Sequence, residues 1–89
     1  MRQFNGHRSW AAWNVSIHIS NDEGLYNAAM FCLKTAQDIK ARAKGTFSAG
    51  FRVEVKAAVL LKKMLPERTP DGARYSHLNL KLCLKGLME

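Results

Sequence analysis

Apolar residues recur at helical spacing between Ser20 and Gly45. Ser20 and Glu23 have the spacing of a capping box, in which two side chains satisfy the first backbone N–H groups of a helix. Gly45 is typical of the residue that follows a helix end. The pattern predicts one long helix, and its apolar face comprises Leu25, Ala29, Cys32, Leu33, Ala36, Ile39 and Ala43.

Met30 and Phe31 lie outside this apolar face. Two interpretations remain open: both side chains contact a second layer of the fold, or they form an exposed apolar patch. An exposed apolar patch is a candidate site for a partner, because isolated proteins expose few contiguous apolar surfaces.

The stretch 51–65 fits a second helix with an apolar side. Glu54 falls on that side, which fits if the helix begins near it, because an acidic residue is favoured in a first turn. Pro66 then ends the helix, because its ring interrupts the backbone. The predicted apolar side comprises Val53, Ala57, Ala58, Leu60, Leu61, Met64 and Leu65.

The opposite side of the same helix is basic. Arg52, Lys56 and Lys63 lie close together around the helix, and Lys62 lies at the rim. More cations occur near the end of the preceding helix. The candidate basic surface therefore comprises Arg52, Lys56, Lys62, Lys63, Lys40, Arg42 and Lys44.

A turn and a last helix complete the predicted elements. The residues TPDG at 69–72 suit a type I turn, and Ser76 can cap a helix that extends to about Leu87. This helix is apolar on two sides, so it is either packed between other helices or partly exposed to a partner. Leu80 and Leu84 on one of these sides join Met30 and Phe31 as the candidate apolar binding residues.

Three stretches also alternate apolar and polar residues as strands do, at 13–19, 51–55 and 78–84. The stretch 78–84 is rich in leucine and lysine, which favour a helix. The stretch 13–19 can be helical as well, with Ser9 as its cap and with Trp10, Trp13 and Ile17 on one face. The two tryptophans are expected in the core, and the alternative is that they stack on the bases of a nucleic acid. We predict a single all-α domain over residues 1–89, a bundle of about four helices. The alternative is an α+β domain in which these stretches form a small antiparallel sheet.

The residues WNV at 13–15 and NDEGLY at 21–26, with Trp10 ahead of them, carry a resemblance. They are similar to the N-terminal segments of small uncharacterised proteins from phages, plasmids and bacterial mobile elements. The similarity covers about residues 5–33, and the turn at 69–72 is similar too. The resemblance implies a mostly helical fold and a mobile-element origin, and it implies no activity.

Charge narrows the classes of partner. Fourteen Lys and Arg residues against seven Asp and Glu residues give a net charge of +7 and a pI near 9.9. Such an excess favours nucleic acid, a nucleoprotein or an acidic protein face as partner, although it also serves solubility. No apolar run is long enough for a membrane span, and the N-terminus lacks the apolar segment of a signal peptide. We expect a protein of the bacterial host's cytoplasm.

Motifs for catalysis or metal binding are lacking in the sequence. His7, His18 and His77 do not combine with Cys32 and Cys83 in a spacing typical of zinc sites. No glycine-rich loop follows a strand to hold a nucleotide, and no nucleophile motif is present. Both cysteines lie in apolar segments and are expected to be buried, reduced thiols. We expect no enzyme, no metal and no cofactor.

Two hypotheses about function follow. The first is a non-enzymatic binding protein of phage type, which inhibits a host machine, such as a defence nucleoprotein complex, by occupying it. The alternative is a small basic module or regulator that binds DNA or RNA, with the candidate basic surface on the phosphates. A homodimer is also predicted as an option, because the last helix has more apolar positions than one face needs.

Overall fold

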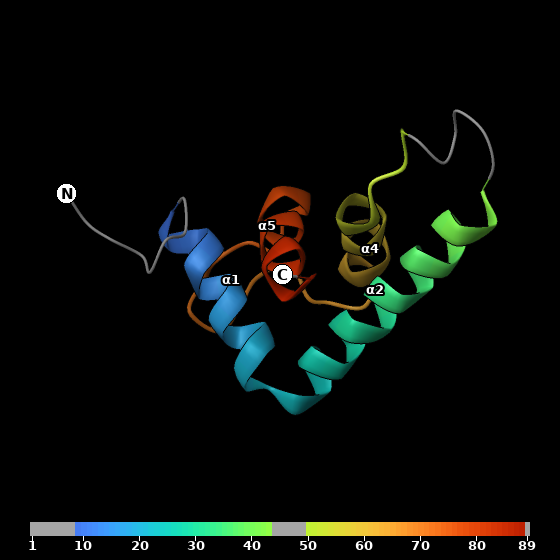
Figure 1. Ribbon diagram of the computed structural model, residues 1–89. Helices are drawn as coiled ribbons and strands as arrows, with labels where there is room; N and C mark the ends of the chain where they lie inside the picture. The colour runs from blue at the N-terminus through green and yellow to red at the C-terminus, as the bar shows by residue number, and fades with distance from the viewer. Residues whose placement is uncertain (1–8, 44–49, 89) are drawn as a thin grey trace.

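The computed structural model describes residues 9–43 and 50–88, and this part of the chain is helical. The helices are α1 (Trp10–Asn21), α2 (Glu23–Arg42), α4 (Val53–Lys62) and α5 (His77–Met88) (Figure 1). No strand occurs in the described residues apart from an isolated bridge between Arg68 and Arg74. The predicted all-α bundle is confirmed, and the alternative sheet is wrong because its three stretches lie in α1, α5 and the start of α4.

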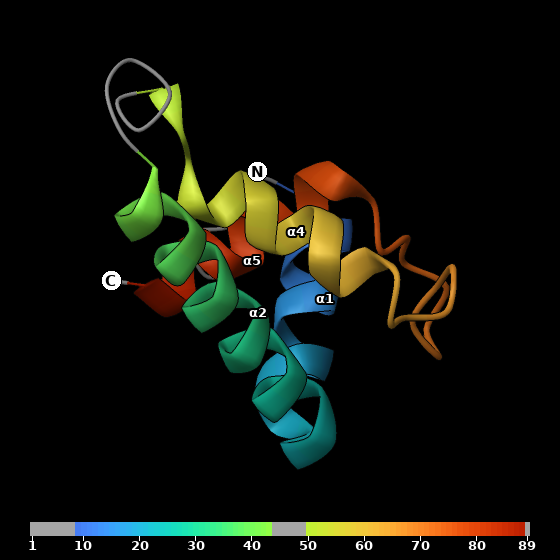
Figure 2. The ribbon, with the colours of Figure 1, turned by 90° about the vertical axis from the view of Figure 1, so that its right-hand side faces the viewer.

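α5 is the central helix of the bundle. It lies between α1 and α4 in Figure 1 and packs against both. The longer α2 crosses the other helices and packs against α1 and α4 (Figure 2). The shared core includes Val15 and Ile19 of α1, Leu33 of α2, Leu61 of α4 and Leu80 of α5. Fully burying one such side chain stabilises a fold by about 1.5–3 kcal/mol. None of the described helices has the length and apolar character needed to cross a bilayer.

Asp22 forms the junction between α1 and α2. It ends α1 and begins α2, and its Oδ1 accepts a hydrogen bond from the backbone N–H of Leu25 at 3.0 Å. The predicted capping box of Ser20 and Glu23 is therefore wrong by two residues, because Ser20 belongs to the last turn of α1. Gly24 leaves room for this cap, since a Cβ there would lie 3.3 Å from the Asp22 carboxylate. The predicted stop at Gly45 lies outside the described residues, and α2 ends at Arg42.

The buried face of α1 differs from the predicted one. Ser9 caps the helix as expected, but Ala12, Val15 and Ile19 are the apolar residues that are buried. Trp10 is 41% exposed, and the prediction of a tryptophan core face is wrong for it. The two faces of α1 are both apolar, and contact with α5 and α2 selects the one with smaller side chains.

α5 buries the two leucines that were predicted as binding residues. Leu80 and Leu84 have no exposed surface, because they face the core from the central helix. Leu78 lies on another side of α5 and is 49% exposed. Ser76 caps α5 as predicted, since its Oγ accepts from the N–H of Asn79 at 3.1 Å.

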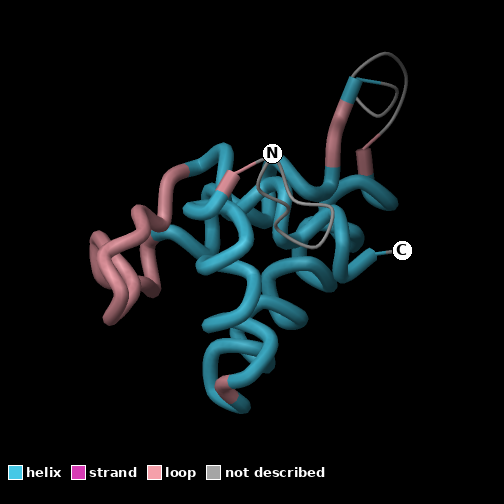
Figure 3. The backbone as a smooth tube through the Cα atoms, turned by 90° about the vertical axis from the view of Figure 1, so that its left-hand side faces the viewer, coloured by secondary structure: helices cyan, strands magenta, loops and turns pink. Residues whose placement is uncertain are grey.

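The segment from Lys63 to Ser76 is the loop that projects on one side of the bundle (Figure 3). The turn at 69–72 is confirmed, because the N–H of Gly72 donates to the carbonyl oxygen of Thr69 at 2.9 Å. Gly72 has a φ of 92°, a value that glycine adopts at low cost. Tyr75 is buried at the end of the loop, and Lys62 Nζ donates to its carbonyl oxygen at 2.8 Å.

Candidate functional site

Two valines on α4 face away from the core. α4 buries Val53, Ala57 and Leu61 against its neighbours. Val55 and Val59 lie one turn apart on another side, and Val55 is 42% exposed. The sequence pattern did not predict an exposed role for this pair, because most apolar residues of the helix lie on the other side. The two valines are nevertheless recognisable in the sequence as an i, i+4 pair between Arg52 and Lys63.

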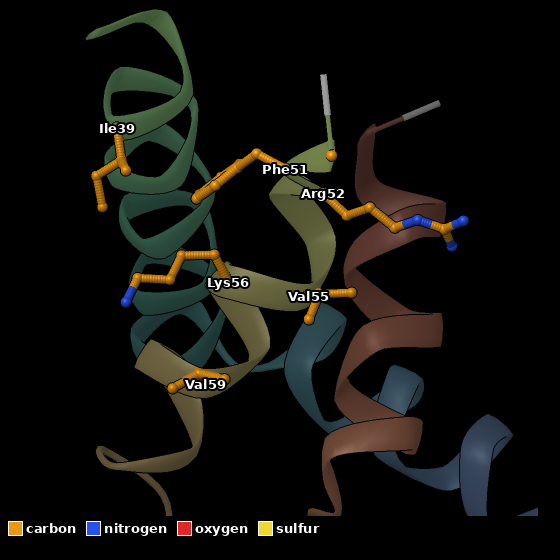
Figure 4. Close-up of a pocket in the computed structure, with 7 residues that line it drawn as sticks. Ile39, Phe51, Arg52, Val55, Lys56 and Val59 are labelled. Atoms are coloured by element: carbon orange, nitrogen blue, oxygen red, sulfur yellow. The ribbon is translucent and has the colours of Figure 1, made fainter. Parts of the chain in front are cut away.

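A hollow opens on the α2 side of these valines. Its volume is about 710 Å³, and Figure 4 shows the side chains that line it. Phe51 extends toward Ile39 of α2, and Lys56 extends to the same side. Arg52 extends to the opposite side of α4, so cations lie on both sides of the valines. The lining is Ile39, Gly50, Phe51, Arg52, Val55, Lys56 and Val59.

A second hollow lies on the α5 side of the same valines. Its volume is about 420 Å³, and it is lined by Val55, Ala58, Val59, His77, Leu78 and Lys81. Val55 and Val59 thus line both hollows and form a ridge between them. We call the whole region the α4 surface, and it comprises Phe51, Arg52, Val55, Lys56, Val59, Leu78 and Lys81.

The α4 surface has cations without acidic counterparts. No acidic residue lines either hollow. Within the part of the chain that the structure describes, the carboxylates close to a basic side chain are Asp71 beside His18 and Glu67 beside Arg74, so Arg52, Lys56 and Lys81 have no carboxylate within ion-pair distance. An anion placed beside these cations therefore does not have to displace a carboxylate of the described chain. The α4 surface thus combines apolar side chains with cations that have no carboxylate beside them.

A second group of polar side chains joins the two motifs that stood out in the sequence. Asp71 Oδ2 accepts from Asn14 Nδ2 at 3.0 Å and lies 2.9 Å from His18 Nε2. Thr69 Oγ1 donates to Asn14 Oδ1 at 2.7 Å and accepts from the N–H of Ala73 at 3.1 Å. We call this group the polar latch (Asn14, His18, Thr69 and Asp71). It fastens the loop after α4 to α1.

The polar latch also alters the acidity of Asp71. The hydrogen bond from Asn14, followed by that from His18, holds the pKa of the Asp71 carboxyl below its ordinary value. Both bonds favour the ionised form because the carboxylate oxygen is the acceptor of each hydrogen bond. Asn14 and Thr69 are buried, so the latch satisfies polar groups that would be costly to leave without partners. The polar latch therefore has a structural role, because its hydrogen bonds hold the loop after α4 against α1.

The profile of one protein family matches residues 1–89, the whole chain. The chain belongs to a family of unknown function, DUF7249. No curated protein and no solved structure matches it. Membership of DUF7249 therefore covers both the α4 surface and the polar latch, and it assigns an activity to neither.

The predicted basic residues of this DUF7249 chain occupy several places. Arg52 and Lys56 flank the α4 ridge, and Lys63 is exposed at the end of α4. Lys62 is half-buried and bonded to the Tyr75 carbonyl, which gives it a structural role. Lys40 and Arg42 are exposed in the last turn of α2, and Lys44 lies outside the described residues.

The predicted apolar patch is wrong for Leu80 and Leu84, because both belong to the core. For the other two members, the structure supports the exposed alternative: Met30 is 38% and Phe31 is 63% exposed. Met30 lines a separate hollow of about 540 Å³ together with Leu33, Lys34, Gln37, Leu87 and Met88. The apolar surface around Met30 therefore continues to Leu87 and Met88 at the end of α5, and not to the predicted Leu80 and Leu84.

The described residues contain no group of three or more His, Cys, Asp or Glu side chains placed to hold a metal ion. Cys32 and Cys83 are free and buried, as predicted. Burial raises the pKa of both thiols, so the nucleophilic thiolate is disfavoured at each position. The α4 surface is therefore the candidate functional site of the described residues.

Proposed function

We propose that the protein is a non-enzymatic binding protein of phage or mobile-element origin. It acts in the cytoplasm of a bacterial host, where it inhibits a host machine, for example a defence nucleoprotein complex, by occupying a site on it. The observation that supports this proposal is the α4 surface. A ridge formed by the exposed Val55 and the half-buried Val59 lies there between two hollows, with cations on both sides and no acidic residue in the lining.

Apolar and charged groups make different contributions to such a contact. Burial of Val55 and Val59 supplies affinity, because apolar surface leaves water. Arg52, Lys56 and Lys81 orient the partner and speed its association, and the net charge of +7 steers acidic partners toward the protein. Inhibition by occupancy needs only a tight contact, which is within reach of a small domain.

An acidic protein face suits the α4 surface better than a nucleic acid does. Phosphates would pair with Arg52 and Lys56. They would make no apolar contact with the valines, which would lie against a charged backbone and not against apolar side chains. The exposed Lys40, Arg42 and Lys63 nevertheless favour DNA or RNA binding as a second candidate function. In that case, binding falls steeply as salt concentration rises.

Affinity purification from the bacterial host tests the proposal. The wild-type protein is compared with the double variant Val55→Glu/Val59→Glu, with and without nuclease treatment of the lysate. We expect a protein partner that survives nuclease and is lost with the double variant. Recovery of nucleic acid alone, of no protein, or of the same proteins with both baits contradicts the proposal.

A matched variant controls for the change of charge. Ser20→Glu/Asn27→Glu introduces the same two charges at exposed positions outside both hollows. It should retain the partner. A helical circular dichroism spectrum and a cooperative thermal transition for each variant show that loss of the partner does not reflect unfolding.

The predicted homodimer has a separate test. The apolar residues left exposed on α2 and α5 include Phe31 and Met88, and a second copy would cover these. Light scattering at several protein concentrations measures whether the mass doubles.

A further inference from the structure

We propose that the partner segment held by the α4 surface is an acidic amphipathic α-helix that packs along the ridge of Val55 and Val59. This inference rests on the proposed function and goes further, since it specifies the secondary structure and charge pattern of the partner.

The shape of the α4 surface matches helix packing. Val55 and Val59 are spaced i, i+4 on α4, and such a pair forms a ridge on a helix surface. A hollow lies on each side of the ridge, of about 710 Å³ toward α2 and about 420 Å³ toward α5. Helices pack by inserting the ridges of one into the grooves of the other. A partner helix can place one row of side chains in each hollow, with the valine ridge in the groove between the rows.

The backbone of the described residues offers no template for an added strand. These residues contain no sheet, so strand addition to a sheet edge has no partner edge here. Proline-rich segments bind in grooves lined by aromatic side chains, whereas the ridge here is made of valines. An amphipathic helix that anchors residues at i, i+3, i+4 and i+7 is the common occupant that suits an aliphatic groove. Phe51 and Leu78 extend the apolar surface beyond the valines on the α2 and α5 sides respectively.

The cations determine the charge of the partner helix. Lys56 extends toward α2, whereas Arg52 extends to the other side of the ridge (Figure 4). Lys81 of α5 lines the second hollow. A helix in the groove therefore has cations along both of its edges, and acidic residues that flank its apolar rows complement them. These ion pairs lie at the rim of the contact, where they select the partner more than they add affinity.

The same charges disfavour the other occupants of this surface. A second copy of the chain docked on its own α4 surface would bring Arg52 and Lys56 of both copies together, and this repulsion opposes association. A nucleic acid would neutralise these cations but would cover the valines with a charged backbone. An acidic amphipathic helix would bury the valine ridge under its apolar side chains and pair its acidic residues with the cations.

Synthetic peptides of about 18 residues, or five helical turns, serve as probes. The first has leucine at i, i+3, i+4 and i+7 with glutamate at the flanking positions. The second replaces each glutamate with lysine, and the third keeps the first peptide's composition but scrambles its order. A short DNA duplex is the fourth probe. Methyl NMR spectra of the full chain, with Val55 and Val59 assigned, report contact at the ridge.

We expect the glutamate helix to shift the Val55 and Val59 methyl signals saturably and to bind at least about tenfold more tightly than the lysine helix, a difference of about 1.4 kcal/mol. The triple variant Arg52→Glu/Lys56→Glu/Lys81→Glu keeps the ridge and reverses the flanks. It should reverse the preference, so that the lysine helix binds more tightly. If these cations only stabilised the fold, the triple variant would bind both helices more weakly but would not prefer the lysine helix over the glutamate helix.

Several outcomes overturn the inference. These are unshifted Val55 and Val59 methyls with the glutamate helix at millimolar concentration, equal binding of the scrambled peptide, or an unchanged preference in the triple variant. Shifts of the same methyls with the DNA duplex, or with protein concentration alone, identify another occupant. If the lysate partner depends on Val55 and Val59 while the helix probes fail, the proposed function stands and only the helical form of the partner is wrong.

Discussion

The carboxylate of Asp71 lies 2.9 Å from the imidazole Nε2 of His18, and this contact joins the loop after α4 to α1. The two residues are far apart in the sequence, and each belongs to a stretch that stood out before the fold was known. Asn14 donates to the same carboxylate oxygen from the preceding turn of α1. The most recognisable residues of the sequence thus hold the fold together, whereas the candidate binding surface lies on α4.

The Asp71 contact predicts an acid-dependent loss of stability. Because the pKa of Asp71 is lower in the folded protein than its ordinary value of 3.8, the ionised carboxylate stabilises the fold. This contribution is fully present above the unfolded pKa and is lost as pH falls through the folded pKa. We expect Asp71→Asn to lower the free energy of unfolding at pH 7 and to flatten its decline below about pH 4. Urea denaturation between neutral pH and pH 2.5 measures both effects.

Glu67→Gln is the matched control for that measurement. Glu67 is an exposed carboxylate whose nearest cation, Arg74, is 4.0 Å away. Its removal should leave the acid limb of the stability curve unchanged. The same flattening in both variants would mean that general charge, and not the bonds to Asn14 and His18, controls the acid response.

Thr69 is the buried member of the polar latch whose hydroxyl has two partners. It donates to Asn14 Oδ1 and accepts from the N–H of Ala73. Thr69→Val keeps the shape and leaves both partners without a bond, so we expect a loss of about 1–3 kcal/mol in the free energy of unfolding. Thr35→Val, at a half-buried position of α2 outside the latch, should change it by less than about 0.5 kcal/mol. Chemical denaturation of both variants decides whether the hydroxyl matters.

The corrected helix start at Asp22 is open to a direct test. Asp22 Oδ1 bonds the N–H of Leu25, so Asp22→Ala should cost about 0.5–2 kcal/mol of stability. Ser20 lies inside α1, and Ser20→Ala should have little effect because it removes no cap. Thermal denaturation distinguishes the two positions, and a larger loss at Ser20 would restore the capping box.

Sequence patterns predicted two helix caps and one turn of this fold correctly, whereas the cap of α2 lies two residues from its predicted position. Ser9 and Ser76 cap their helices, and the turn at 69–72 has its expected hydrogen bond. Each of these depends on side chains within a few residues of the backbone groups that they bond. The core face of α2 was also predictable, since one apolar stripe was dominant along its length.

Features that depend on contacts between helices could not be predicted in the same way. α1 has two apolar faces, and only its packing against α5 and α2 determines that Val15 is buried while Trp10 is exposed. α5 likewise has apolar residues on several sides, and its central position buries Leu80 and Leu84. The α4 surface depends on which valines the neighbours leave uncovered, so it becomes visible only when α2 and α5 are in place.

The different environments of two leucines on α5 lead to opposite expectations. Leu84→Ala removes a side chain with no exposed surface, and we expect it to cost about 2–5 kcal/mol of stability. Leu78→Ala changes an exposed residue that lines the second hollow, so it should leave stability within about 0.5 kcal/mol and weaken partner binding. Denaturation together with the peptide titration separates these roles. Weakened binding without destabilisation in Leu84→Ala would reinstate its predicted place in the apolar patch.

A charge reversal at the end of α2 distinguishes the two candidate functions. Lys40 and Arg42 are exposed and line neither hollow of the α4 surface. If an acidic helix docks on α4, Lys40→Glu/Arg42→Glu should change its dissociation constant by less than about threefold at physiological salt, where charges beyond roughly 8 Å are screened. If the protein instead binds DNA or RNA through its basic residues, the loss of two phosphate contacts lowers affinity by more than tenfold and reduces the slope of log K against log salt by about 2. Titration of each probe at several salt concentrations measures both quantities, and a large loss with the peptide would place its binding site on α2 instead of α4.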